Sequence, residues 1–496
     1  SLRRSGTQMR ITIQVIEAEK GLHIWSRSFD VPIGDIFLIE DTVSRAVAEA
    51  LHLTLSGDTA EQWAQRQPEK MEAYELYLLG RARQRKRTAE DNVKAAEFFR
   101  RAVAADPQYA LAQVGLAETL LNSLSLNRAP LEDVSAEAEP IINRALALSP
   151  NLPDALAVKG WLLTEEFRLD EALPLLQRAI KANPNDASAH RFLGNLYDRR
   201  ADPTSALSHF SLAAGLDPLD FISQVFRCQE LIDLGEFERA QEACARARML
   251  EPGNMWGPLA TSAIARAQGD LPEAVRWLEQ ARKLAPADEW LADQLMELMV
   301  TQGRTREARG LLDQLPGAGS FLALSRESFV VLAEGGADGL RKWLAEREVA
   351  SKAVTGADLS ELARLQYVAG EFTAARATLA HAQRILPLSS VDMFDGSQIR
   401  HDYSASLFHA GIELKGGGDA KRAQELLGQL DRMLANYEKH GGQHYGLYSL
   451  RAASLAMQGK TAEAESVLET AWKHGWRAKW RARGDPYLSQ VRMPGD

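Results

Sequence analysis

A chain of 496 residues exceeds the size of one ordinary compact core, so we expect either several domains or an elongated array. Its net charge of -9 argues against the basic stripe that a nucleic-acid-binding surface needs. Two cysteines cannot form a framework of several disulfides, and no apolar run reaches the about 18 residues of a membrane span.

The first 55 residues predict a small α/β fragment. Ile11, Ile13 and Val15 alternate with polar residues, which indicates a β-strand, and a turn at residues 19–21 leads into a second strand at 23–29. Residues 2–5 can supply a third strand. A helix with an apolar stripe is expected from Asp35 onward. A polar linker over residues 56–70 then separates this β-meander and helix from the rest of the chain.

This fragment resembles part of a domain of bacterial multidomain regulators, related to the amino-terminal domain of TolB and to the FlgO family. The segments that carry the resemblance are Ser1–Gly6, Arg10–Thr12, His23–Ser26 and Asp35–Phe37. Members of that family place a further strand and helix before these segments. We therefore expect that the chain belongs to a longer gene product, or that it begins after a cut.

From residue 71 onward, a repeat of 34 residues dominates the sequence. An alanine stands five residues before each of five regularly spaced prolines, which are Pro150, Pro184, Pro218, Pro252 and Pro286. Small residues let two helices approach closely, and proline ends a helix because it lacks the amide hydrogen. A fixed period of this length predicts helix pairs that bury their apolar faces by stacking on their neighbours.

The unit from Ala187 to Asp220 shows the pattern best. It carries Leu193, Gly194, Tyr197, Ala206, Phe210, Ala213 and Pro218, with His190 where the pattern has tryptophan. This arrangement resembles the tetratricopeptide repeat. The resemblance implies an all-α superhelix of about ten helix pairs that follows a small N-terminal α/β fragment in the chain. We expect regular repeats over residues 71–314, an irregular helical insertion over 315–356, and degenerate repeats with a cap over 357–496.

The resemblance implies a binding groove. In this repeat type the first helix of each unit lines the concave face, with its second, fifth, ninth and twelfth positions directed into the groove. The residues expected to bind a peptide or protein partner are Trp161, Arg191, Asn195, Asp198, Ile222, Val225, Gln229, Trp256 and Leu259. The alternative for each is ordinary packing beneath an adjoining helix, because apolar helix positions are usually core.

Two other motifs give weaker evidence for a binding or catalytic site. Gly459-Lys460-Thr461 ends like a phosphate-binding loop but lacks its first glycine, and we interpret it as a turn between two helices. His440 and His444 are four residues apart, yet the two glycines between them favour an exposed loop over a zinc-binding helix. The sequence thus predicts no metal and no cofactor.

Three further features have simple interpretations. Cys228 and Cys244 lie in facing positions of one repeat, and we favour two buried thiols over a disulfide. The basic run over residues 81–87 and the pair Glu165-Glu166 are interpreted as solvated helix surfaces.

Together these features predict a non-enzymatic scaffold or docking module of a bacterial regulator, with a protein or peptide partner, no nucleic acid and no membrane span. In the proteins it resembles, this architecture follows a cyclase, a winged-helix domain or a kinase. The alternative is a small-ligand sensor near Trp25, Tyr74 and Tyr77 that controls a linked cyclase or transcription-factor domain. Self-association through an end of the solenoid is also open. An enzyme would need catalytic groups in residues 315–356 or 389–403, where no convergent set is found.

Overall fold

The computed structural model describes residues 2–5, 8–16, 23–32, 68–126, 129–315, 321–385 and 408–495. The N-terminal part is an antiparallel meander of β1 (Leu2–Ser5), β2 (Gln8–Ile16) and β3 (His23–Pro32), in the order β1-β2-β3. The predicted meander is therefore confirmed. The helix expected from Asp35 and the linker expected over residues 56–70 lie outside the described residues, except for the last three linker residues.

Cross-strand pairs stabilise this sheet. Arg10 on β2 forms a bidentate ion pair with Asp30 on β3, with both nitrogen–oxygen distances at 2.7 Å. Thr12 and Ser28, the next pair on the same face, share a hydrogen bond of 2.8 Å. Ile11, which points to the opposite face, is buried.

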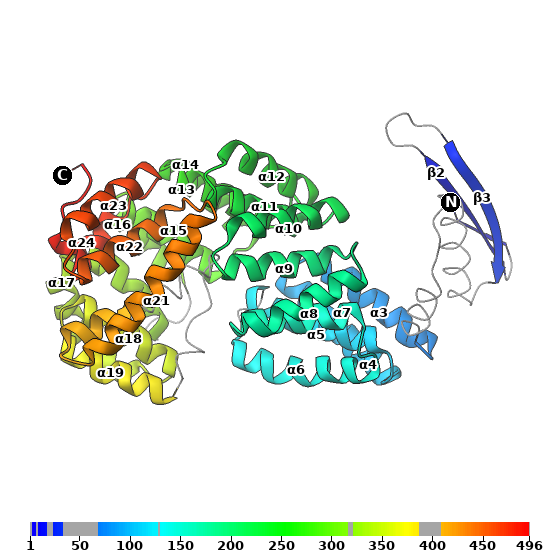
Figure 1. Cartoon of the computed structure of the whole chain (residues 1–496), viewed down its shortest axis with the longest axis horizontal. Coiled ribbons are helices and arrows are strands. Elements are labelled where there is room, and N and C mark those ends of the chain that lie inside the picture. The colour runs from blue at the N-terminus through cyan, green and yellow to red at the C-terminus, as the bar shows by residue number, and fades with distance from the viewer. Residues whose placement is uncertain are drawn as a thin grey trace.

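The rest of the described chain is almost entirely helical and is built from stacked helix pairs (Figure 1). The regular pairs are α3 (Met71–Gln84) with α4 (Ala89–Ala105), α5 (Ala110–Leu126) with α6 (Leu131–Leu148), α7 (Pro153–Glu165) with α8 (Leu169–Ala182), α9 (Ala187–Arg199) with α10 (Pro203–Leu216), α11 (Phe221–Asp233) with α12 (Phe237–Leu250), α13 (Trp256–Ala267) with α14 (Leu271–Leu284), and α15 (Glu289–Thr301) with α16 (Thr305–Leu312).

The C-terminal elements continue the stacking less regularly. They are α17 (Phe321–Glu346), the short 3-10 helix η1 (Val349–Lys352), α18 (Gly356–Val368) with α19 (Phe372–Ile385), a helix at residues 408–415 with α21 (Ala420–Lys439), α22 (Tyr445–Met457) with α23 (Thr461–Lys473), α24 (Lys479–Gly484) and η3 (Leu488–Gln490). Gly336, with a φ of 60°, interrupts α17. The architecture is an all-α tetratricopeptide-repeat superhelix with a small N-terminal β fragment.

The prolines and glycines of the repeat have the structural roles that the sequence predicts. Helices α6, α8, α10, α12 and α14 each end two residues before their proline. A Cβ atom at Gly194 of α9 would lie 2.6 Å from the Phe210 ring of α10, so only glycine permits this helix contact. Phe99 of α4 lies in the same way between Gly80 of α3 and Gly115 of α5. Close packing across each seam thus links one pair to the next.

The superhelix curves until its C-terminal part touches its own middle. Asn436 Nδ2 on α21 donates a hydrogen bond to the Arg200 carbonyl oxygen, at 2.7 Å. Thr204 Oγ1 donates to the His440 carbonyl oxygen, and the Gln443 amide donates to the Asp233 carbonyl oxygen, each at 2.6 Å. We call this contact the clasp; it joins the end of α21 and the loop after it to the turns that follow α9 and α11.

A second contact continues the clasp further along the chain. A Cβ atom at Gly475 would lie 1.9 Å from the Ala267 carbonyl oxygen, so the turn after α23 presses directly against the end of α13. One superhelical turn thus lies on the next. Within the described ranges, no helix combines the length and the apolar character needed to cross a membrane.

Candidate functional site

A cavity of about 70 Å³ lies between the first helices of the first four helix pairs. Its lining comes from the first helices of successive pairs, together with the cap before α9. The lining residues are Tyr77, Arg81, Leu111, Val114, Gly115, Glu118, Asp154, Ala157, Val158, Asp186, Ser188 and Phe192. Most of them recur at equivalent positions of α3, α5, α7 and α9, the positions that the repeat pattern directs into the groove.

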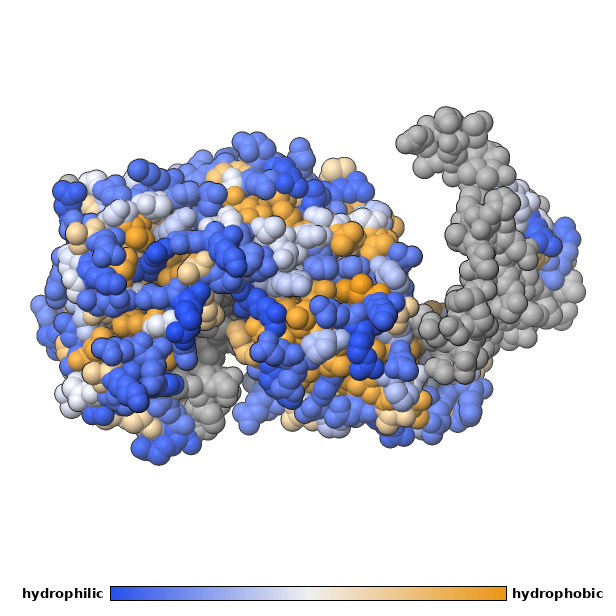
Figure 2. All heavy atoms as spheres, viewed as in Figure 1, coloured by the Kyte–Doolittle hydropathy of each residue, from blue (hydrophilic) through white to orange (hydrophobic). Residues whose placement is uncertain are grey.

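Figure 2 shows the surface over this end of the array. Apolar residues gather around α5, α7 and α8 on the face in view, with hydrophilic residues between and around them. A surface of this kind, apolar with a few directed polar groups, suits a peptide or another protein.

One half of the cavity is electrically balanced. Arg81 Nη1 donates to Glu118 Oε2 at 2.7 Å and to Gln84 Oε1 at 2.7 Å. Burial acts to raise the pKa of Glu118, but the positive charges of Arg81, Arg191 and Arg87 outweigh it and leave that pKa below its ordinary value. Glu118 is thus a stable carboxylate with a fixed partner.

The other half is acidic. Asp186 caps α9, and its Oδ1 accepts hydrogen bonds from the amides of Ser188 and Ala189, at 2.9 and 3.2 Å. Burial raises the pKa of Asp186, and the negative charge of Asp154 raises it further, against the opposing effect of the two amides. Asp154 thus acts on Asp186 across the starts of α7 and α9, and it also interacts with the positive charge of Arg81.

Aromatic packing fixes the wall behind the cavity. Trp161 stacks on Phe192 with 4.6 Å between ring centres, and its Nε1 donates to Glu165 Oε1 at 2.7 Å. Glu165 in turn accepts from Arg199 at 2.6 Å, and both side chains are buried. The interpretation of Glu165 as a solvated surface residue is therefore wrong, because it is the buried partner of Arg199.

The residues predicted to bind the partner fall into two groups. Buried ones are Trp161, Arg191, Ile222 and Val225, and half-buried ones are Asn195, Asp198, Gln229, Trp256 and Leu259. Trp161 and Arg191 meet at Phe192, since the Arg191 guanidinium carbon lies 4.9 Å from that ring's centre. Ile222, Val225 and Trp256 share a separate apolar cluster around α11, α12 and α13, so the structure does not bring all nine residues to one place.

The cavity-lining residues Arg81, Glu118, Asp154 and Asp186 were not among the predicted site residues, and Tyr77 was named only for the small-ligand alternative. The sequence could have indicated Arg81 and Glu118, because they occupy in α3 and α5 the same repeat position that Trp161 occupies in α7. The insertions in the first two repeats change the spacing and make this equivalence hard to recognise in the sequence. The run over residues 81–87 is also not simply a solvated surface: Arg81 binds Glu118, and Arg87 donates to Asn122 Oδ1 at 2.5 Å.

The two remaining sequence motifs, at residues 459–461 and 440–444, each connect two helices. Gly459 has a φ of 76° between α22 and α23, which confirms the predicted turn. The loop from His440 to His444 joins α21 to α22, as expected, but it is not simply exposed, because it forms part of the clasp and His444 is buried. In the part of the chain that the structure describes, no group of His, Cys, Asp or Glu is arranged to hold a metal ion.

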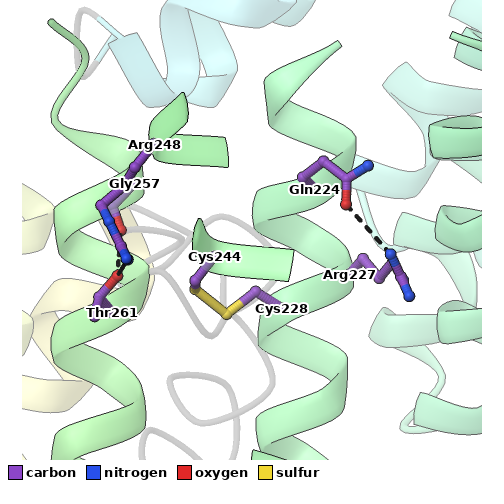
Figure 3. The surroundings of a disulfide bond; sticks show 7 residues. All are labelled: Gln224, Arg227, Cys228, Cys244, Arg248, Gly257 and Thr261. Carbon is purple, nitrogen blue, oxygen red and sulfur yellow. Dashed lines mark hydrogen bonds between the residues drawn. A yellow bond between two sulfur atoms is a disulfide. The ribbon is translucent and has the colours of Figure 1, made fainter. Parts of the chain in front are cut away.

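The two cysteines are joined. A disulfide links Cys228 on α11 to Cys244 on α12, and both residues are fully buried (Figure 3). The favoured interpretation as two free thiols is thus wrong. The facing positions were correctly identified, but the spacing of cysteines in a sequence does not reveal their oxidation state.

Comparison with known proteins agrees with the repeat architecture. Residues 159–221 and 265–320 match family models described as tetratricopeptide repeat. The chain is similar to a candidate adenylate cyclase, adenylate cyclase 3 of Rhizobium meliloti (strain 1021), with 29% identity over 173 residues, which are 35% of this chain and 30% of that protein.

Two further similarities are more limited. Anaphase-promoting complex subunit 7 of Mus musculus is 33% identical over 92 residues, which are 18% of this chain and 16% of that protein. The crystal structure of yeast Tom70 aligns with 84% of this chain and 98% of its own, at 13% identity and a TM-score of 0.35. The chain spans less than a third of the length of the Rhizobium meliloti and Mus musculus proteins.

Proposed function

We propose that this chain is a non-enzymatic interaction module that binds a peptide or protein partner in its concave groove. The cavity between α3, α5, α7 and α9 is the observation that carries the proposal, because its lining comes from the groove positions of successive repeats. Stacked helix pairs form extended concave surfaces that suit such partners. The site then combines the cavity with the half-buried groove residues Asn195, Asp198, Gln229, Trp256 and Leu259.

The proposal includes a place in a bacterial regulatory protein. The order of β1, β2 and β3 agrees with the resemblance to a TolB-related and FlgO-related fragment, and the Rhizobium relative bears the name of a cyclase. In that setting the groove would dock a partner or another part of the same polypeptide, and a linked effector domain would respond. Self-association through an end of the solenoid would provide a second kind of partner.

Selection of peptides from a random display library on the intact chain tests the proposed function. Enriched peptides are measured by calorimetry against native protein, the groove variant Asn195→Ala/Gln229→Ala, and the control variant Arg178→Ala/Arg239→Ala on the second helices. We expect about tenfold weaker binding to the groove variant and native affinity for the control. Equal affinity for all three proteins, or no enrichment at all, would refute groove binding.

The sensor alternative has one observation in its favour, which is that Tyr77 lines the cavity. A small metabolite would then occupy the cavity without a peptide. Thermal shift with a metabolite set, beside the selected peptides, separates the two functions: stabilisation by a metabolite with no peptide enrichment supports the sensor.

A further inference from the structure

The clasp rests on acidic side chains where α9 and α11 end. Asp198 lies near the end of α9, Asp202 follows that helix as the cap of α10, and Glu230 and Asp233 lie in the last turn of α11. The loop after α21 covers this turn of α11, because it bonds to the Asp233 carbonyl oxygen and a Cβ atom at Gly441 would lie 3.2 Å from Leu234 Cδ2. The titratable groups and the clasp thus share one interface.

Glu230 is the least compensated member of this group. It is 3% exposed, and its Oε2 has no hydrogen-bond partner. Burial raises the pKa of Glu230 well above its ordinary value, and the negative charges of Asp198, Asp233 and Asp202 act in the same direction. An ionised Glu230 is therefore unfavourable beneath the clasp, whereas a protonated one is not repelled by its neighbours.

The arginines next to this interface have other partners. Arg199 donates to Glu165 of α7 at 2.6 Å, and Arg200 donates to Asp170 of α8 at 2.6 Å. Both guanidinium groups are thus bound to carboxylates of the preceding helix pair. Among the described residues, the charges that act on Glu230 are those of the three aspartates.

His440, which directly follows α21, brings a second titratable group to the interface. Its Nδ1 lies 2.8 Å from the Asn436 carbonyl oxygen, and its Nε2 lies 3.6 Å from Asp202 Oδ2. A carbonyl oxygen only accepts hydrogen bonds, so Nδ1 carries a hydrogen. The neutral ring then directs the Nε2 lone pair at the Asp202 carboxylate, and the protonated ring directs an N–H group at it. On the same helix, Glu438 is paired with Arg451.

We propose that the clasp is a pH-sensitive latch, which closes when Glu230 and His440 are protonated and opens when both have lost their protons. Opening the clasp admits water to the end of α11 and moves His440 away from Asp202. The inference rests on the clasp contacts alone and does not depend on a partner in the groove.

Both groups act on the latch in the same direction. The closed clasp binds the proton of Glu230 more tightly than the open one, because burial and the neighbouring aspartates disfavour the carboxylate. It also gives a protonated His440 a carboxylate partner. A state that binds protons more tightly gains stability as pH falls. The gain is lost as pH rises through the range in which the two groups release their protons.

Hydrogen exchange of the intact chain, followed by mass spectrometry, tests the latch. The readout is the protection factor of residues 437–444, corrected for the intrinsic pH dependence of exchange, from pH 5.5 to pH 8.5. This segment contains the amides of Gln443 and His444, which both donate in the clasp. We expect about tenfold or more protection at pH 5.5 relative to pH 8.5. Residues 459–464, in the turn between α22 and α23, are the internal control and should change much less.

Variants assign the pH dependence to the two groups. Glu230→Gln keeps the size of the side chain and should raise protection of the clasp at pH 8.5 about fivefold or more, without changing it at pH 5.5. Glu230→Gln/His440→Gln should show no pH dependence. Glu238→Gln and His381→Gln, at exposed positions of α12 and α19, should keep the native profile. Urea unfolding checks each fold, and Glu230→Gln alone decides the test if the double variant does not fold.

Three results would overturn the inference. Equal protection of residues 437–444 across the pH range would show that the clasp does not respond to protons. A native pH profile in Glu230→Gln and in the double variant would assign the response to other groups. An equal loss of protection in residues 459–464 at high pH would show general unfolding in place of a local latch.

Discussion

The hydroxyl group of Tyr437 on α21 donates a hydrogen bond to the Asp233 carbonyl oxygen at the end of α11, 3.2 Å away and 204 residues earlier in the chain. The same hydroxyl accepts from the His444 amide at 3.2 Å, and the tyrosine is buried. One side chain thus connects the loop of the clasp to a central repeat. The end of the superhelix is held against its middle by specific polar contacts.

Tyr437→Phe should therefore loosen the clasp without disturbing the central repeats. The variant leaves the His444 amide without its acceptor, which should cost about 1–2 kcal/mol. Hydrogen exchange should accelerate at residues 436–444 and in the turn at residues 200–204. Tyr448→Phe on α22 is the matched control. Unchanged exchange at both segments would mean that the clasp does not depend on this hydroxyl.

Gly194→Ala should destabilise the fourth helix pair. The new methyl group would lie 2.6 Å from the Phe210 ring, so α9 and α10 must separate, at a cost of about 1–3 kcal/mol. Gly215→Ala, in the last turn of α10, meets no atom within 4 Å and should be neutral or stabilising by up to about 1 kcal/mol. Urea unfolding of both variants gives the comparison. Equal effects would contradict a role for close packing at Gly194.

Glu230→Gln should stabilise the protein at neutral pH. Burial raises the pKa of Glu230, and the negative charges of Asp198, Asp233 and Asp202 raise it further. Because the folded-state pKa exceeds the unfolded value of about 4.3, the folded protein holds the proton more tightly. The resulting stability is present below that unfolded value and is lost as pH rises through the folded value.

Unfolding free energies of native protein and Glu230→Gln, measured from pH 4 to pH 8, check this sign. The advantage of the variant should be largest at pH 8 and disappear toward pH 4. The exposed Glu238 of α12 supplies a control, Glu238→Gln, which should follow the native curve. A native protein that gains stability relative to Glu230→Gln as pH rises would show that Glu230 is stabilised as a carboxylate.

The sequence predicts the repeat because each repeat residue acts on a neighbour in the chain. Pro218 follows the end of α10 by two residues, and Gly194 faces Phe210 within one helix pair. The clasp could not be predicted in this way. Its bonds join residues such as Asn436 and Arg200, 236 positions apart, and no 34-residue pattern encodes which turn meets which.

The candidate site, like the clasp, could be predicted only in part from the sequence. Trp161 was predicted as a groove residue with packing as its alternative, and the structure gives it both surroundings: it is buried, yet it backs Phe192 in the cavity wall. Arg81 and Glu118 occupy groove positions that the position rule selects once the insertions before α5 and α7 are allowed for. Their pairing depends on how α3 and α5 pack, which composition and charge do not show.

Removing the disulfide should weaken the fifth helix pair. Cys228 and Cys244 are separated by 16 positions, and closing a loop of that size contributes about 3 kcal/mol by restricting the unfolded chain. Under non-reducing conditions Cys228→Ala/Cys244→Ala should therefore unfold at lower urea than native protein. In excess reductant the two proteins should become similar, because the native bond opens on unfolding. Thiol titration in denaturant provides the independent measurement: unreduced native protein should release no reactive thiol, and two thiols per chain would show that the cysteines are not paired.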